Sequence, residues 1–311
     1  MKRSLVYIFA TIVLAFVLRE IEYSGLRMNK QGQFAKYDRI FLEKNNFDML
    51  VIGSSRAETH FRPDIISDSI HLTCYNAGLL GATMPFIQGC LNAYLQKSLP
   101  PKYVILNVDY HMFIACDDTI RQFPVYFPYL SNDALYEKFS ERDARFPWFR
   151  YNPFYSLPYM GSKYLDISIR GYLNTPGKYD TAFRMGYSPI RGMLKEDLDS
   201  VNITPYSPWL SKASWQSLTG IMDTCRARNI KLLLVYSPLY HRLSESILNE
   251  KQVIRYIDSI GHEHGCSSFD YHLCPIAYDK TNFTDLDHLT RKGTAAFSEL
   301  FSHDLKQYLH R

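Results

Sequence analysis

The chain has 311 residues, of which 46% are hydrophobic and 21% are charged, so it can bury a sizeable core and is not an intrinsically disordered protein. Its formal net charge of +4 is small and spread along the chain. This argues against nucleic acid as a partner, because proteins that bind nucleic acid usually carry a clustered basic face.

The N-terminal residues predict a membrane anchor. Lys2 and Arg3 precede an uncharged stretch from Ser4 to Leu18, which Arg19 closes. This stretch is short for a membrane span, which normally needs about 20 residues, and it also fits the apolar region of a signal peptide. No small-residue cleavage site follows it, so we expect residues 1–25 to form an uncleaved signal anchor. A cleaved signal peptide and a buried helix are the alternatives.

The positions of the basic residues predict the orientation of this anchor. They precede the apolar stretch, and the residues after it are mixed or acidic. By the positive-inside rule, the bulk of the chain therefore lies outside the cytoplasm.

Apolar runs alternate with helical patterns after the anchor. The expected strands are 47–55, 71–78, 101–109, 230–238 and 266–272, and the expected helices are 84–99, 209–229, 250–265 and 290–310, the last with Thr290 as its N-cap. Strands that read as unbroken apolar runs favour a parallel sheet covered on both faces. We therefore expect a three-layer, flavodoxin-like α/β domain over residues 40–311, with its active site beyond the carboxyl ends of the strands.

Between the third and fourth strands lies a long insertion, about residues 110–208. It contains most of the aromatic surplus, in FPVYFPYL and ARFPWFRYNPFYSLPYM, where repeated aromatic–Pro pairs are expected to break any long helix or strand. One interpretation is a loop-rich subdomain that packs on the core. The other is a wall for sugar rings or a surface that rests on the membrane, since Tyr and Trp have an apolar face and a polar tip.

The first expected strand ends in Gly53-Ser54-Ser55, and its hydroxyls are candidates for a nucleophile. A serine is activated when a base takes its proton and a third group orients that base. Asp285 and His288 supply such a pair just before the last helix, with Asp285 holding one imidazole nitrogen and the adjacent Asp287 expected to point elsewhere. The alternatives are that Ser55 caps a helix starting near Arg56 and that His288 is a surface-loop histidine bonded to Asp285.

These blocks resemble the SGNH (GDSL-like) hydrolases and acyltransferases. The first block of that family, Gly-Asp-Ser, is matched by Gly53-Ser54-Ser55, and the second, which supplies an oxyanion-hole glycine, by YNAGLLGAT with Gly81. The last block, Asp-x-x-His, is matched by Asp285-Leu286-Asp287-His288. The resemblance covers roughly 47–109 and 230–310 and leaves the insertion uncovered.

The resemblance implies the role of each residue in the site. Ser55 would be the nucleophile, His288 the base and Asp285 the group that orients it. The backbone N–H groups of Ser55 and Gly81 would bind the oxyanion.

One block of the family is missing from this chain. Where the family has Gly-x-Asn-Asp, the sequence reads LNVDYHMF, so Asn107 or His111 would have to substitute. Arg56 is a candidate for steering an anionic substrate, with a solvated surface position as the alternative, and Asn76 is expected to brace the turn of the second block.

The Gly-Ser-Ser form and the N-terminal anchor are most similar to the family branch that acts at bacterial cell envelopes, which includes the teichoic-acid D-alanyl-transfer protein and the alginate O-acetylation proteins. This similarity implies a single-pass protein of the bacterial inner membrane with a periplasmic domain. It would be a serine esterase or O-acyltransferase acting on acyl groups, acetyl first among them, of an envelope polysaccharide. A polytopic acyl-exporting membrane protein is the implied partner, and no metal or organic cofactor is needed.

Two other functions stay open. One is a catalytically inactive SGNH-fold protein that binds glycan or scaffolds an envelope complex, and the other is a plain secreted lipase or esterase. Metal-ligand residue types also gather near the C-terminal end of the chain, at His262, His264, Cys266, His272 and Cys274, but their spacing matches no zinc module. Asp285, Asp287 and His288 are also metal-ligand types, which the triad explains better, so no metal site is expected.

Overall fold

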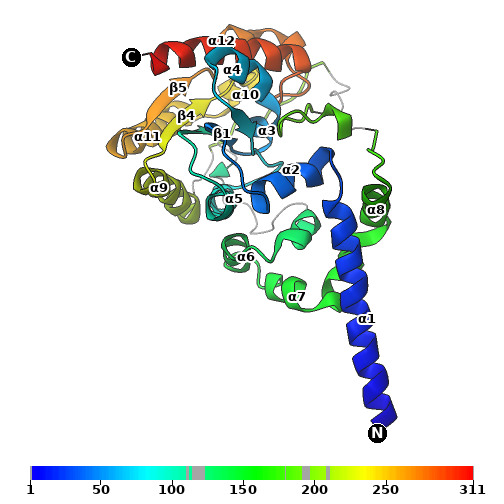
Figure 1. Cartoon of the computed structure of the whole chain (residues 1–311). Coiled ribbons are helices and arrows are strands. Elements are labelled where there is room, and N and C mark those ends of the chain that lie inside the picture. Colours follow the sequence, from blue (N-terminus) through cyan, green and yellow to red (C-terminus); the bar gives the residue numbers. More distant parts are fainter. Residues whose placement is uncertain are drawn as a thin grey trace. The chain divides into compact units, whose positions relative to one another are not determined.

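The computed structural model describes residues 2–109, 112–113, 123–178, 180–190, 197–207 and 211–310. The chain forms two compact units (Figure 1). Unit 1 comprises residues 1–44, 92–97 and 118–183, and unit 2 comprises residues 45–91, 98–117 and 184–311. The predicted boundaries of the α/β domain and its insertion stay a prediction.

Unit 2 contains a parallel sheet with the strand order β2-β1-β3-β4-β5 (Figure 1). The strands are β1 Met49–Ile52, β2 Cys74–Asn76, β3 Tyr103–Asn107, β4 Lys231–Tyr236 and β5 Ser267–Asp270. Each lies within one of the five predicted ranges, so the predicted parallel α/β sheet is confirmed. In the register of the sheet, Leu50 of β1 pairs with Val104 of β3, and Leu106 of β3 pairs with Leu234 of β4.

Helices cover both faces of this sheet. On one face, Met49 and Val51 of β1 share a buried apolar cluster with Phe297 and Phe301 of α12 (Arg291–Leu309). On the other face, α11 (Glu250–Glu263) approaches Leu234 so closely that a Cβ on Gly261 would lie 2.7 Å from the leucine Cδ1. Successive strand residues point to opposite faces, so these contacts build the predicted three layers.

The four helices predicted for the α/β domain are confirmed by α5 (Met84–Lys97), α9 (Lys212–Ala227), α11 and α12. Thr290 caps α12 as predicted, since its Oγ1 accepts a hydrogen bond from the N–H of Gly293 at 3.1 Å. The remaining helical elements of unit 2 are α3 Ser55–His60, α4 Pro63–Ile70, α10 His241–Ser246, η4 Pro275–Tyr278 and η5 Lys280–Asn282.

Unit 1 is helical and has an aromatic core. Its elements are α1 Lys2–Arg27, α2 Gly32–Phe41, η2 Phe123–Tyr129, α6 Asp133–Ser140, α7 Phe146–Tyr151, α8 Pro153–Leu173 and η3 Asp180–Ala182. The ring of Tyr37 stacks on Tyr126, with centroids 5.2 Å apart, and Phe139 packs edge-on against both Tyr126 and Phe146. These buried rings account for much of the aromatic surplus of the sequence.

The aromatic–Pro pairs are expected to break any long helix, and α8 consists of two helical segments joined by a kink. Pro153 lies in its first turn, where the helix needs no N–H donor, and Pro158 lies inside it. The helix instead kinks at Gly161, whose φ of 53° and ψ of 179° are not helical. Glycine adopts this conformation without steric cost.

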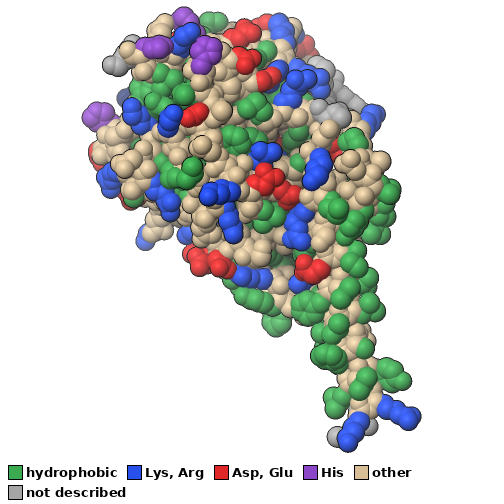
Figure 2. Space-filling view, viewed as in Figure 1, with side chains coloured by type: hydrophobic (Ala, Val, Ile, Leu, Met, Phe, Trp, Pro, Cys, Tyr) green, Lys and Arg blue, Asp and Glu red, His purple; other side chains and the backbone are tan. Residues whose placement is uncertain are grey.

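The described part of the predicted anchor segment lies in α1, which ends two residues later than expected. The helix is long and apolar enough to cross a membrane by length and composition. Large apolar side chains from Leu5 to Ile21 are exposed along it, whereas Ala15, Arg19 and Tyr23 are buried (Figure 2). The packed body of unit 1 therefore begins partway along α1.

Candidate active site

The turn after β1 presents two serines to different partners. Gly53 has a φ of 147°, and a Cβ there would lie 2.7 Å from the Cβ of Ala57, so the turn requires glycine. Ser54 is the N-cap of α3, and its Oγ accepts a hydrogen bond from the N–H of Arg56 at 3.4 Å. The same hydroxyl donates to Oδ2 of Asp109 at 2.5 Å. The alternative in which Ser55 is the N-cap is therefore wrong, because Ser54 takes that place.

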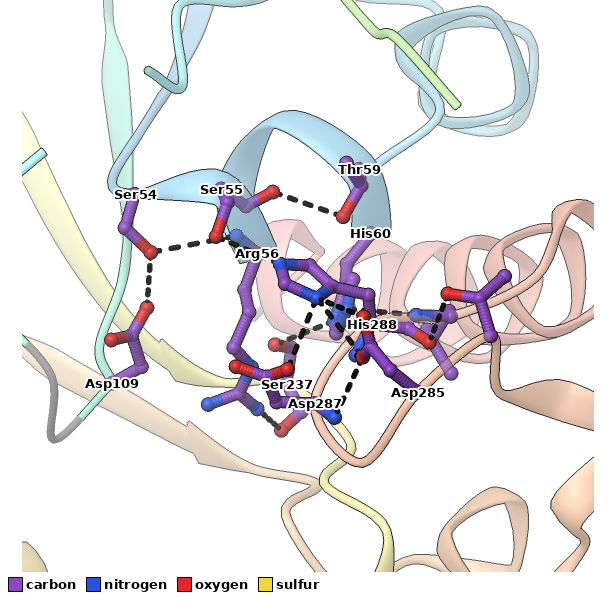
Figure 3. A network of polar contacts seen from close by, with 12 residues as sticks. Ser54, Ser55, Arg56, Thr59, His60, Asp109, Ser237, Asp285, Asp287 and His288 are labelled. Carbon is purple, nitrogen blue, oxygen red and sulfur yellow. Dashed lines mark hydrogen bonds and ion pairs between the residues drawn. The ribbon is translucent and has the colours of Figure 1, made fainter. Parts of the chain in front are cut away.

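Ser55 faces a histidine that is 233 residues further along the chain (Figure 3). Its Oγ lies 2.8 Å from Nε2 of His288, and Nδ1 of His288 lies 3.0 Å from each carboxylate oxygen of Asp285. The backbone N–H of His288 also donates to Asp285 at 2.7 Å, which fixes the loop that carries both residues. The structure thus brings together the three residues proposed as nucleophile, base and orienting group.

Asp287 also contacts the imidazole, and the expectation that it points elsewhere is wrong. Its Oδ1 lies 3.0 Å from Nδ1 of His288. Burial lowers the pKa of His288, but hydrogen bonds to Asp285 and Asp287 outweigh burial and raise the pKa to about 10. The raised pKa favours the protonated imidazole, which opposes the action of His288 as a general base at neutral pH.

His60 is a buried histidine that sequence reasoning missed. Its Nε2 accepts the backbone N–H of Leu289 at 3.2 Å, so its proton lies on Nδ1, which donates to Ser237 Oγ at 3.0 Å. Burial, supported by the positive charges of Arg56 and His288, holds the pKa of His60 well below its usual value. The neutral ring packs edge-on to His288, with centroids 6.4 Å apart. The only sequence signal is its place one helix turn beyond the candidate nucleophile.

Arg56 is buried, so the alternative of a solvated position is wrong. Its Nη2 donates to the carbonyl oxygens of Ser237 at 2.5 Å and Pro238 at 3.2 Å. Arg56 also lines a cavity of about 30 Å³ together with Asp109 and His272, which is space for water rather than for a sugar ring. Its contact with substrate stays a prediction.

The second block of the site contains Asn76 and Gly81, which have different surroundings. Asn76 braces the second block as expected, since its Nδ2 donates to the carbonyl oxygens of Ala57 and Phe61 and its Oδ1 accepts from the N–H of Gly78. Gly81 lies in the exposed turn after β2, with a φ of 71°.

Neither of the substitutes for the missing block is established. Asn107 is fully buried behind Gly53, and in the described part of the chain neither of its amide atoms has a hydrogen-bond partner. His111 lies outside the described residues. The binding of an oxyanion by Ser55, Gly81 or Asn107 therefore stays a prediction.

Of the two groups of possible metal ligands, only one brings its ligand atoms close together among the described residues. One ligand atom from each of Asp285, Asp287 and His288 lies within 4.8 Å of the others, and the imidazole of His288 is already bonded to Ser55 through Nε2 and to both carboxylates through Nδ1. Among the described residues, the histidines and cysteines of 262–274 do not gather within that distance.

Comparisons with known proteins place few constraints on this site. No family model matches the sequence, and neither does any curated protein. Among solved structures, it is similar to a protein from Desulfitobacterium hafniense DCB-2 that is provisionally described as a lipolytic protein of the G-D-S-L family, at a TM-score of 0.41 and 12% identity over 83% of this chain and 99% of that chain.

Two further structures are similar at the same level. A protein from Streptococcus pneumonia, provisionally described as a platelet activating factor, has a TM-score of 0.42 and 11% identity over 99% of both chains. A provisionally described acylhydrolase from Bacteroides fragilis NCTC 9343 has a TM-score of 0.41 and 12% identity over 89% of this chain and 96% of that chain. With identities this low, function has to be inferred from the side chains themselves.

Proposed function

We propose that the chain is a serine esterase or O-acyltransferase with Ser55 as nucleophile, His288 as base and Asp285 as the group that orients the base. The observation that supports this is the continuous hydrogen-bonded line from Ser55 Oγ through both imidazole nitrogens of His288 to Asp285, at 2.8 and 3.0 Å. A serine, a histidine and a carboxylate in this geometry are the elements of nucleophilic acyl transfer.

In the proposed reaction, Ser55 Oγ attacks the carbonyl carbon of the acyl donor while His288 Nε2 takes the hydroxyl proton. The backbone N–H of Ser55, at the start of α3, and that of Gly81 stabilise the oxyanion. The tetrahedral intermediate collapses, and the leaving alcohol receives the proton from His288. Water or a sugar hydroxyl then attacks the acyl-enzyme, which distinguishes an esterase from a transferase.

We further propose where this chemistry takes place. The exposed apolar surface of α1, with Lys2 and Arg3 at its start, supports a membrane anchor with the bulk of the chain outside the cytoplasm. The acyl acceptor or donor would be an envelope polysaccharide of a bacterium, and the partner a polytopic acyl-exporting membrane protein. These assignments rest on the resemblance of the sequence blocks.

Labelling with a fluorophosphonate probe tests the nucleophile. The full-length protein in detergent is compared with Ser55→Ala, His288→Ala and the matched control Ser69→Ala, which removes a serine hydroxyl from α4 of the same unit. We expect labelling of the wild type and of the control, none of Ser55→Ala, and a labelling rate about 10²–10⁴-fold lower for His288→Ala. Labelling that persists in Ser55→Ala would falsify the assignment.

A binding protein without catalysis is the second candidate. It is favoured by the second carboxylate on Nδ1 of His288, since Asp285 and Asp287 together raise the pKa of the group that must act as the base. The labelling experiment separates the two functions when it is repeated between neutral pH and pH of about 10, the pKa of His288. Labelling that increases with pH supports the enzyme. A folded protein that stays unlabelled at every pH supports glycan binding, which is then measured with polysaccharide in place of the probe.

A further inference from the structure

Unit 1 exposes a group of large apolar side chains that its aromatic core does not use. On α7, Phe146 and Phe149 are buried, whereas Trp148 and Tyr151 are 58% and 63% exposed. Phe154, in the first turn of α8, is 49% exposed. Tyr172 and Leu173, at the other end of α8, are 46% and 66% exposed. We call the five exposed residues the apolar rim: Trp148, Tyr151, Phe154, Tyr172 and Leu173.

Contacts within unit 1 place both parts of the apolar rim at one level of α1. Nη1 of Arg19 donates to the carbonyl oxygen of Arg150, between Trp148 and Tyr151, at 3.2 Å. The hydroxyl of Tyr172 donates to the carbonyl oxygen of Ile21 at 2.7 Å. Arg19 and Ile21 are less than one helical turn apart on α1, so both parts of the apolar rim contact α1 at nearly the same height along the helix.

The close contact between α1 and α8 holds this level in place. A Cβ on Gly171 would lie 1.8 Å from the carbonyl oxygen of Gly25, and a Cβ on Gly25 would lie 2.1 Å from Ser168 Oγ. Only glycines allow the two helices to approach this closely. The helices cannot slide past one another without losing this contact.

The length of the apolar stretch places Arg19 and Ile21, and with them the apolar rim, at the surface of the membrane. Ser4 to Leu18 extends about 22 Å along a helix, whereas the hydrocarbon core of a bilayer is about 30 Å thick and takes about 20 residues. A span that starts at Ser4 therefore ends near Tyr23. The contacts at Arg19 and Ile21, with the half-exposed Glu20 between them, fall just inside this limit, where charged side chains near a helix end can reach the headgroups. A bilayer crossed by α1 therefore reaches the body of unit 1.

The composition of the rim fits this environment. Trp and Tyr are enriched at the boundary between acyl chains and headgroups, because their apolar rings and polar tips suit both sides. The guanidinium of Arg19 is kept from lipid, since it is buried and bonded to Glu20 and to the Arg150 carbonyl oxygen. Figure 2 shows apolar side chains continuing from α1 onto the part of unit 1 next to it.

We propose that the apolar rim enters the headgroup boundary of the bilayer that α1 spans, so that unit 1 rests on the lipid surface. This inference rests on the proposed anchoring by α1 and does not depend on the proposed chemistry at Ser55. The occupant of the rim is lipid, because the rim continues the lipid-facing surface of α1 at the depth where a short span draws the body of the protein into the boundary.

Fluorescence quenching by brominated lipids tests the depth of Trp148. The full chain carries two other tryptophans: Trp215 in α9, and Trp209, which lies outside the described residues. The variant Trp209→Phe/Trp215→Phe is inserted into phosphatidylcholine vesicles whose lipids are brominated at either the carbonyl end or the methyl end of the acyl chain. The emission of a side chain about 5–10 Å into the boundary should be quenched more by the first lipid than by the second.

The matched control is a tryptophan on α8, the helix that carries Tyr172 and Leu173 of the apolar rim, but further from the predicted boundary of the bilayer. Leu165 is also an exposed apolar residue, and it lies two residues before Ile167, whose carbonyl oxygen accepts a hydrogen bond from Asn29 at 3.2 Å. Arg27, the last residue of α1, is about 12 Å further along the helix axis than Arg19, and Asn29 follows it after the end of the helix. We expect Leu165→Trp, in a background without the three native tryptophans, to be quenched at least about twofold less, since it lies beyond the boundary depth.

Three outcomes overturn the inference. In the first, the protein stays on the vesicles through an alkaline wash but Trp148 is not quenched. The anchor is then supported, the contact of the rim with lipid is contradicted, and a membrane protein becomes the candidate partner of the rim. Equal quenching of Trp148 and of the Leu165→Trp variant contradicts the assigned depth. Protein that the wash removes contradicts the anchor itself, while probe labelling of Ser55 in the same sample still reports separately on the proposed chemistry. If the double variant does not fold, the quenching lost on Trp148→Phe in the native chain gives the same information.

Discussion

At the scale of single residues, the site differs from a simple triad because two carboxylates share one imidazole nitrogen. Asp285 and Asp287 both lie 3.0 Å from Nδ1 of His288. One carboxylate is enough to orient a histidine and to stabilise the imidazolium formed in the reaction. The second adds stability to the imidazolium before the reaction begins, and this opposes general base catalysis at neutral pH.

The activity of the protein should therefore depend on pH in a specific direction. Proton uptake by His288 requires the neutral imidazole, whose fraction grows as pH rises toward its pKa of about 10. We expect the rate of probe labelling at Ser55 to rise across this range in the wild type. In Asp287→Asn, loss of one negative charge lowers the pKa of His288, so the rising limb should move about one pH unit lower.

Measured pH profiles of labelling in the two proteins provide the check. Glu299→Gln on α12 is a suitable control, since it removes a carboxylate from the same unit at a position outside the hydrogen-bonded site. Its profile should match that of the wild type. Coincident profiles of Asp287→Asn and wild type would show that Asp287 has no influence on the base.

The difference between predicted and observed residues at the site has a physical origin. Gly53-Ser54-Ser55 and the Asp285–His288 pair could be found from the sequence, because strand ends and short spacings are local properties. The contact of Asp287 depends on the path of one loop, and the burial of Arg56 and His60 depends on the loop after β4. Those positions are set by residues about 180 positions away and leave no local pattern.

At the scale of elements, His60 connects three segments that carry the site. It belongs to α3, donates to Ser237 in the loop after β4, and accepts from Leu289 in the loop before α12. Because Leu289 follows His288 directly, this hydrogen bond helps to hold His288 within hydrogen-bond distance of Ser55. We regard His60 as a positioning residue that acts through His288.

Replacing His60 should therefore affect stability and geometry together. His60→Ala leaves the N–H of Leu289 and the hydroxyl of Ser237 without a partner, and each buried unsatisfied group costs about 1–3 kcal/mol. We expect a lower unfolding midpoint and, at temperatures where the variant is folded, slower labelling of Ser55. His60→Asn, which can donate and accept, should recover part of both. The exposed His303→Ala on α12 should change neither.

Calorimetry and labelling rates on the three variants decide this. A variant that is less stable but is labelled at the wild-type rate would show that His60 only packs the core. Equal stability of His60→Ala and His303→Ala would contradict the role of the two hydrogen bonds.

The elements themselves were predictable to different degrees. The strands β1, β3 and β4 are unbroken apolar runs because both of their faces are covered, and periodicity with a capping threonine marked α12. Apart from the anchor helix, the helices of unit 1 were not predicted. Aromatic–Pro pairs normally interrupt regular structure, but here the rings of Tyr37, Tyr126 and Phe139 pack together and stabilise short helical segments.

At the scale of the whole molecule, the described residues of the candidate site and the anchor helix belong to different units. Ser55, Asp285 and His288 all belong to unit 2, and α1 belongs to unit 1. The sequence predicts one α/β domain with an insertion. It does not reveal that residues 1–44 pack with 118–183, because such contacts join distant segments through side-chain shape.

A charge in the middle of α1 should therefore separate anchoring from chemistry. Leu14 is 56% exposed and lies near the centre of the span from Ser4 to Tyr23. A lysine there costs about 2.5–3.5 kcal/mol at the centre of a membrane helix, so Leu14→Lys should move much of the protein from the membrane to the soluble fraction after cell lysis. Leu14→Ala, which keeps the segment uncharged, should stay with the membrane.

Probe labelling of each fraction then shows whether the two units act independently. Soluble Leu14→Lys should label at Ser55 at the wild-type rate, since the substitution is in unit 1 and the hydrogen bonds of Ser55, His288 and Asp285 are all made within unit 2. Loss of labelling in folded soluble protein would mean that the reaction depends on the membrane or on a partner within it. Full retention in the membrane would mean that α1 is not what anchors the chain, and the apolar rim on α7 and α8 would become the first surface to mutate.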